Sequence, residues 1–190
     1  MLVEFPLFAA GINYFPGEIS ALRVFEPRYL LLIGDSIVKE KKFLVGRNLD
    51  EINQIVSEVE IIEHQDISNA EQLVIIESKK LFKVKNIDLN QEYPMCSAIE
   101  HNDIGLPPSI SELDELEKKI KKMTAKLIEQ GLNTSIPEFV IDSENRLIKL
   151  WELCIYTPMD LNIKNVLINE NDISKRFVIL TNYVDNVIKT

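Results

Sequence analysis

The strongest constraint on the fold is a change of hydrophobic pattern near the middle of the chain, at the Gly-Leu-Pro-Pro sequence of residues 105–108. Before it, apolar residues form short runs or alternate with polar ones between turn residues, which is typical of β-strands. After it, apolar residues recur every three or four positions, which is typical of amphipathic helices. The sequence therefore predicts a β-rich domain over residues 1–105 and a helical domain over residues 106–190.

The first domain is expected to contain short strands and one helix. The alternation of polar and apolar residues over 58–61 indicates a half-buried strand. Pro27 suits the first position of a helix, where no backbone donor is needed. Strands are predicted at residues 2–8, 19–24, 43–46, 56–62, 73–77, 81–87 and 94–100. Short strands separated by turns favour a compact barrel or sandwich over a parallel α/β sheet.

Four helices are predicted in the second domain. Ser109 and Glu112 have the spacing of a capping box, and Gly131 is placed to end the helix that they begin. The other helices are predicted at residues 146–156, 160–168 and 172–187, after a loop that contains Pro137. Each helix has an apolar face, so the four are expected to pack as a small bundle.

The N-terminal residues carry a specific resemblance. The ordered segments Phe-Pro-Leu-Phe at 5–8, Phe-Pro-Gly at 15–17 and Leu-Arg-Val-Phe-Glu-Pro-Arg-Tyr at 22–29 resemble the opening signature of the Lon substrate-binding domain. That domain forms the N-terminal region of ATP-dependent Lon proteases, occurs alone in bacteria, and occurs within cereblon. The resemblance implies an α+β fold, in which a PUA-like β pseudo-barrel with one inserted helix precedes a C-terminal helical bundle. It also implies recognition of unfolded or peptide-like segments.

Two positions depart from the family pattern. Asn13 stands where the family usually has an aliphatic residue, so the local packing is expected to differ. Ser78 stands where the family has a glycine that precedes an Arg-Phe pair, and Leu81 replaces that arginine before Phe82. Any close approach that the glycine permits is therefore in question.

We predict that the signature is mainly scaffold, with its charged side chains paired to lock a turn against the helix. Its residues are Phe15, Pro16, Gly17, Arg23, Phe25, Glu26, Pro27, Arg28 and Tyr29. The candidate peptide anchors are instead two aromatic residues beside an expected groove between barrel and bundle. Tyr14 is expected to be exposed on the barrel, and Phe139 lies in an apolar loop for which covering the bundle is favoured over contacting a peptide.

No pattern for catalysis or metal binding is found. The six glycines form no phosphate-binding loop, and there is no nucleophile elbow or sequence signal for a Ser-Lys dyad. His64 and His101 are expected at solvated strand ends, and Cys96 and Cys154 lack the spacing of metal ligands. We therefore expect no enzymatic activity, no catalytic residues, no metal and no cofactor.

Charge and composition narrow the partners. The formal net charge of −9 disfavours nucleic acid. No apolar run reaches membrane-spanning length, and no secretory signal is expected. Two unpaired thiols suit the cytoplasm. The main hypothesis is a non-catalytic module that binds unfolded or peptide-like protein segments, with a separate ATPase or protease as a further candidate partner. The alternatives are an accessory part of an ATP-dependent peptidase and RNA binding through the PUA-like barrel.

Overall fold

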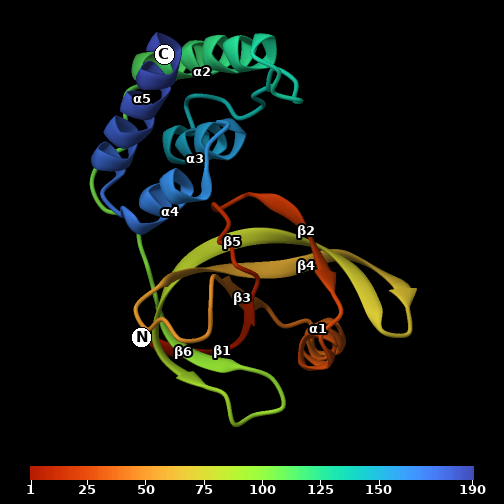
Figure 1. The fold of residues 1–190 in the computed structure, drawn as a ribbon. Coiled ribbons are helices and arrows are strands. Elements are labelled where there is room, and N and C mark those ends of the chain that lie inside the picture. Colours follow the sequence, from red (N-terminus) through yellow and green to blue (C-terminus); the bar gives the residue numbers. More distant parts are fainter. The chain divides into compact units, whose positions relative to one another are not determined.

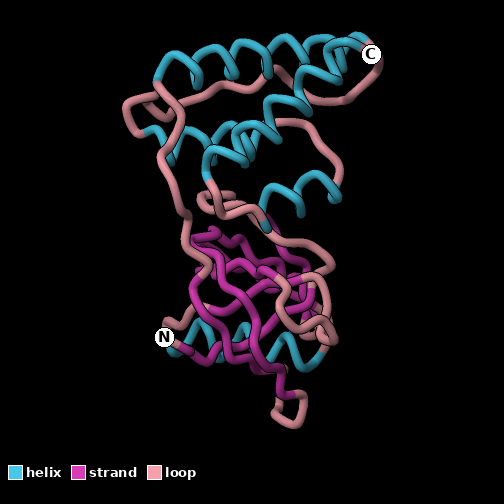
Figure 2. Tube along the Cα trace, turned by 90° about the vertical axis from the view of Figure 1, so that its left-hand side faces the viewer, coloured by secondary structure: helices cyan, strands magenta, loops and turns pink.

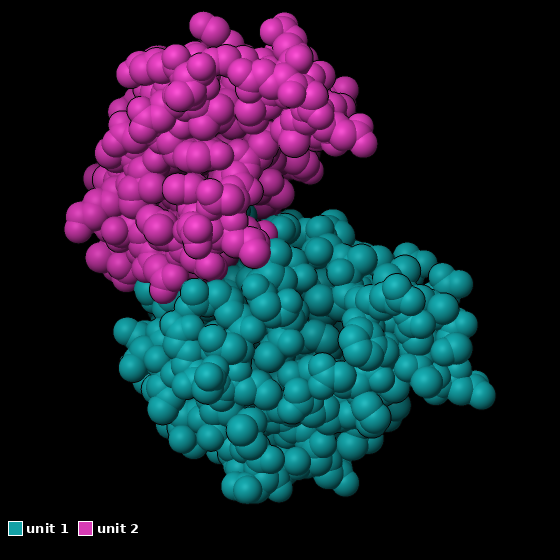
Figure 3. All heavy atoms as spheres, viewed as in Figure 1, with its two compact units in different colours: residues 1–102 teal, residues 103–190 magenta.

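The computed structural model describes all 190 residues and divides into two compact units. Unit 1 comprises Met1–Asn102 and unit 2 comprises Asp103–Thr190 (Figure 3). The sequence placed the domain boundary after residue 105. The two units are described separately below.

Unit 1 is a six-stranded sheet with one helix, α1 (Pro27–Lys39) (Figure 1). The strands follow the order β2-β5-β4-β3-β1-β6, and a second pairing between β5 and β6 closes the sheet into a barrel. β1 and β3 run parallel, and the other pairs are antiparallel. The strands are β1 (Leu2–Ala9), β2 (Ile19–Val24), β3 (Phe43–Gly46), β4 (Ile55–Ser68), β5 (Glu71–Asp88) and β6 (Met95–Glu100). This arrangement confirms the predicted pseudo-barrel with one inserted helix.

Strands β4 and β5 are longer than predicted. The sequence indicated two strands at 73–77 and 81–87, whereas the structure has one continuous strand, β5. The intervening Ser-Lys-Lys segment contains no glycine or proline, and Ser78 bonds through its backbone to the segment before β2. Its N–H donates to Glu18 C=O at 2.9 Å, and its C=O accepts from Gly17 N–H at 2.8 Å. A serine at the position of the family's glycine therefore still allows these backbone hydrogen bonds to Gly17 and Glu18.

Parts of the barrel strands are buried on both faces, as in β3 and at the end of β1. Adjacent residues of a strand point to opposite sides of the sheet, so Leu7 and Phe8 enter different cores. Leu7 joins the core inside the barrel, with Phe82 and Cys96 among its other members. Phe8 joins the larger core, which includes the α1 residues Tyr29, Leu32 and Ile33. Residues near the end of β1 are thus held from both sides.

Unit 2 is the predicted helical bundle, and its helices are the cyan segments in the upper part of Figure 2. The capping box of α2 is present, since Ser109 N–H donates to Glu112 Oε2 at 2.8 Å and Glu112 N–H donates to Ser109 Oγ at 3.4 Å. The helices are α2 (Ile110–Glu129), α3 (Arg146–Tyr156), α4 (Leu161–Asn169) and α5 (Ile173–Lys189). No helix in the structure has the length and apolar character that crossing a membrane requires.

A buried arginine organises the centre of unit 2. Arg176 has no exposed surface, and its guanidinium lies 3.8 Å from the centre of the Trp151 ring. It pairs with Asp103 and donates to the carbonyl oxygens of Leu167, at 3.2 Å, and Glu170, at 2.6 Å. These bonds compensate much of the cost of burying the charge. Arg176 therefore joins the start of the unit to α4 and α5.

Candidate peptide-binding site

Strand β2 is an edge strand that pairs only with β5. The bond from Ser78 N–H to Glu18 C=O shows that Glu18 directs its backbone carbonyl toward β5. Because backbone groups alternate in direction along a strand, residues 20, 22 and 24 direct their N–H and C=O groups toward β5. The backbone groups of Ile19, Ala21 and Arg23 therefore face away from the sheet and have no strand partner.

A hollow of about 400 Å³, lined mainly by apolar residues, borders this free edge. It lies between residues 21–26 on one side and residues 8–14 on the other, with Tyr29 contributed by α1. Arg23 and Glu26 are the only charged residues among its twelve lining residues. A hollow of this size and character suits apolar side chains of a ligand.

The wall opposite β2 is formed by the segment that follows β1. Ala9 N–H donates to the Tyr29 hydroxyl at 3.2 Å, and Ala10 N–H donates to Gly46 C=O at 2.9 Å. Gly11 then turns the chain with a φ of 74°, a conformation that favours glycine. These contacts tie the segment to α1 and β3 and direct its hydrogen bonds away from β2. The free edge of β2 is thus left without a neighbour on this side.

Tyr14 lies in the core of unit 1 with only 4% of its surface exposed. The prediction that Tyr14 is exposed is therefore wrong. Its N–H donates to Ser57 Oγ at 2.7 Å, and its C=O accepts from the same hydroxyl at 2.8 Å. Burial raises the pKa of Tyr14, while a hydrogen bond with the Ser20 side chain opposes that rise. The ring is fixed between β4 and β2 and forms an inner wall of the hollow.

The departure at Asn13 explains part of this arrangement. Asn13 is buried, and its side-chain amide donates to Ile55 C=O at 2.7 Å. An aliphatic residue could not make this bond. Asn13 and Tyr14 together fasten the segment to the beginning of β4.

Phe25 is the exposed aromatic residue of the signature, with 64% of its surface accessible, and it lies at the rim of the hollow. Phe15 and Tyr29 are buried, as expected of scaffold, but this exposure does not fit a core role for Phe25. The alternation of inward and outward side chains along β2 indicated the exposure of Phe25. Because Leu22 and Val24 point inward, the odd-numbered positions, including 25, are directed outward.

The charges at the rim are balanced. Arg28 pairs with Glu26 at 2.9 Å and lies over the Tyr29 ring, 4.7 Å from its centre. Arg23 pairs not with these helix residues but with Glu71 on β5. The rim therefore presents no net charge to a ligand.

Phe139 belongs to unit 2, where it contributes to anchoring the loop between α2 and α3. Its half-buried ring meets Tyr156 edge to face at 5.9 Å, and Lys149 Nζ lies 5.0 Å from the ring centre. The next two residues of the loop donate their N–H groups to Glu152 Oε1, Val140 at 2.6 Å and Ile141 at 3.0 Å. These contacts support the covering role that the sequence left open for this loop.

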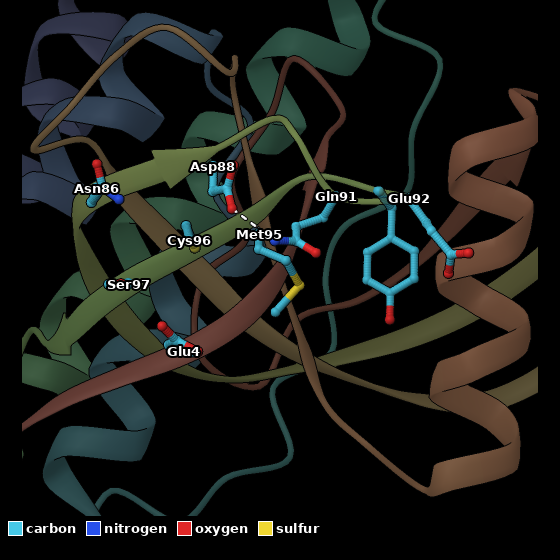
Figure 4. A pocket seen from close by; sticks show the side chains of 9 residues that line it. Glu4, Asn86, Asp88, Gln91, Glu92, Met95, Cys96 and Ser97 are labelled. Atoms are coloured by element: carbon cyan, nitrogen blue, oxygen red, sulfur yellow. Dashed lines mark hydrogen bonds between the residues drawn. The ribbon is translucent and has the colours of Figure 1, made fainter.

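A second hollow in unit 1, of about 470 Å³, has a different character (Figure 4). Its lining includes the carboxylates of Glu4, Asp88 and Glu92, and hydrogen bonds from Gln91 and Asn90 lower the pKa of Asp88. Burial raises the pKa of the adjoining Cys96 thiol to about 12. The thiol is thus protonated near neutral pH and unsuited to nucleophilic chemistry. This acidic lining suits an apolar segment less well than the hollow beside β2.

The histidines do not form a metal site. His64 is exposed within β4 rather than at a strand end, and His101 is half-buried after β6, with its N–H donating to Leu81 C=O at 2.8 Å. No group of three or more His, Cys, Asp or Glu side chains is arranged to hold a metal ion.

Comparisons with known proteins agree with this architecture. The family model of the ATP-dependent protease La (LON) substrate-binding domain matches residues 4–186. A Lon N-terminal domain protein from Xanthomonas campestris has a similar fold, with a TM-score of 0.69 and 22% identity, over 95% of this chain and 98% of that one. The N-terminal domain of the Mycobacterium avium complex Lon protease is also similar, with a TM-score of 0.72 and 12% identity, over 97% of this chain and 99% of that one. The predicted α+β fold is thereby confirmed. Comparison with curated proteins gave no match.

Proposed function

This chain belongs to the ATP-dependent protease La (LON) substrate-binding domain family, and from that premise we propose that it recognises exposed apolar segments of unfolded proteins through the hollow beside β2. We propose further that it does so in the cytoplasm and without catalysis. The single observation that carries the proposal is the joining of a hollow lined mainly by apolar residues to the unpaired edge of β2, with Phe25 exposed at its rim.

The hollow suits an uncharged apolar ligand. Ion pairs neutralise Arg23 and Glu26, so a charged ligand side chain would leave water for a surface that offers it no counter-charge. An apolar side chain would instead cover Phe25 and the small residues Ala9 and Ala10 on the facing wall. Burying two leucine-sized side chains contributes about 3 to 6 kcal/mol before the cost of association. Binding through these side chains alone is therefore expected to be weak, with a Kd no tighter than about 100 μM.

Fluorescence polarisation with a labelled nine-residue peptide, in which Leu alternates with Ser or Thr, tests the proposal. We expect saturable binding that single-stranded RNA does not displace. Phe25→Ala should weaken it about fivefold or more, because the ring covers the ligand's apolar side chains. The matched control is Leu89→Ala, since Leu89 is a similarly exposed apolar residue of unit 1 outside this hollow and should leave the affinity unchanged.

The same titration decides between the competing functions. Absence of binding up to about 500 μM would refute peptide recognition. Preferential RNA binding that weakens steeply with salt would favour the RNA hypothesis, which the charge of −9 opposes. Cleavage of the peptide by the isolated chain, or only after a partner ATPase is added, would favour the peptidase hypothesis. Phe139→Ala tests the second predicted anchor, since a loss of affinity would extend the contact to unit 2.

A further inference from the structure

We infer that the bound segment adds to the barrel as an extra strand along β2, and that the ligand class is therefore extended, proline-free and apolar at every second residue. This inference rests on the proposed function and specifies its binding mode. Its central observation is the row of backbone groups at Ile19, Ala21 and Arg23 that face away from β5.

Strand β2 lacks the features that normally prevent pairing at an exposed edge. Edge strands are commonly protected by proline, bulges or unpaired charges. The pairing of β2 with β5 runs from Ile19 to Val24 without a register shift, and the strand contains no proline. Its one charged side chain, Arg23, is neutralised by Glu71. The edge is regular and its one charge is neutralised, so none of these three features protects it.

The other open edge of the sheet is protected in these ways. Beyond Val59, β4 has left β3 and pairs only with β5. This stretch carries Glu63, His64 and Asp66, and its pairing is interrupted by register shifts at Ile61/Glu63 and Asp66/Ser68. The contrast within one sheet makes β2 the edge where strand addition is expected.

The hollow accommodates such a strand. A strand rises about 3.3 Å per residue, neighbouring strands lie about 4.8 Å apart, and stacked sheets lie about 10 Å apart. The product of these three spacings gives a volume of about 160 Å³ per strand residue. The hollow of about 400 Å³ therefore holds two to three residues. Side chains alternate across a strand, so one in two would enter the hollow and meet Ala9, Ala10 and Ile12. This geometry selects a segment whose apolar residues have a period of two.

A scan of N-methylated peptides tests the binding mode. Each variant of the nine-residue probe carries one N-methyl group, which removes one backbone donor and blocks close approach at that residue. Strand pairing predicts that methylation costs about tenfold in Kd at alternate central residues and little at those between them. Equal effects at all positions would overturn strand addition. Peptide recognition itself would stand, because the unmodified probe still binds.

The protein side of the contact is tested with Ala21→Pro. The Ala21 N–H points away from β5, so proline removes no bond of the sheet, and edge strands tolerate proline in this orientation. Its ring occupies the approach to the free edge, and we expect the affinity to fall by about tenfold or more. Leu89→Ala, which lies outside the hollow and outside β2, is the control and should bind as the natural chain does.

Circular dichroism and thermal melting establish whether the Ala21→Pro variant is folded. Unchanged affinity in a folded Ala21→Pro variant would refute strand addition. If that variant does not fold, the alternation in the N-methyl scan decides alone. Loss of binding by the unmodified probe in the natural protein would instead refute the proposed function on which the inference rests.

Discussion

Replacing Glu152 by Gln separates the charge of this side chain from its role as a hydrogen-bond acceptor. Glu152 is 5% exposed, and its Oε1 accepts the N–H groups of Val140 and Ile141 from the loop that carries Phe139. Its Oε2 pairs with Lys149, which is 2% exposed, at 3.0 Å. Glutamine retains an oxygen for the loop but removes the negative charge that faces the buried ammonium group.

The size of the effect follows from the other partner of Lys149. Removing one member of a buried ion pair costs about 3 to 5 kcal/mol when the remaining charge is left alone. Here Glu117 still pairs with Lys149 at 2.6 Å, so a smaller loss of about 2 kcal/mol is expected. Glu152→Ala also removes the acceptor for the two loop N–H groups and should cost about 3 to 4 kcal/mol.

Thermal unfolding followed by circular dichroism measures both losses. A loss of about 2 kcal/mol corresponds to a fall in Tm of about 4 to 8 °C for a chain of this size. Glu138→Gln is the matched control, because Glu138 is an exposed residue of the same loop, and its Tm should remain close to that of the natural chain. An unchanged Tm for Glu152→Gln would refute the view that its charge stabilises unit 2.

Three further outcomes are expected. Gly46→Ala should lower the Tm, because a Cβ there would lie 2.8 Å from Val56 Cγ1 and overpacking costs about 1 to 3 kcal/mol. Cys96 and Cys154 should resist a thiol reagent at pH 8 until the protein is unfolded, because burial raises the pKa of each to about 12. Burial acts to raise the pKa of Glu117, but its pairs with Lys121 and Lys149 outweigh burial and lower the pKa overall. The stability that the ionised Glu117 contributes should therefore be present above about pH 4.5 and lost as the pH falls further. Urea unfolding at graded pH measures this loss.

Local patterns predicted the elements well where one residue type decides the structure. Helix α3 has the predicted bounds, and the capping box at Ser109 and Glu112 forms as its spacing indicated. The division of β5 failed because Ser-Lys-Lys looks like a turn when its neighbours are unknown. Backbone pairing of Ser78 with Gly17 and Glu18, far away in the sequence, keeps that strand continuous.

The site was harder to predict because it depends on contacts that no local pattern contains. Tyr14 was expected at the surface from its place before a turn, yet bonds to Ser57 hold it in the core. Strand β2 was predicted with its observed bounds, but its free edge follows from the order of strands in the sheet. The exposure of Phe25 could have been predicted from the period of two along that strand.

The walls of the hollow explain why a signature that predicts the fold is a poor guide to the ligand. Most of those walls are also core, as Tyr14 and Tyr29 illustrate, so substituting them would disturb folding and binding together. Phe25 and Ala21 border the same hollow but are exposed and lie outside the core. Binding can be changed independently of stability at these two positions. A loss of affinity there in a folded protein would therefore report on recognition, whereas the same loss at a core position would not.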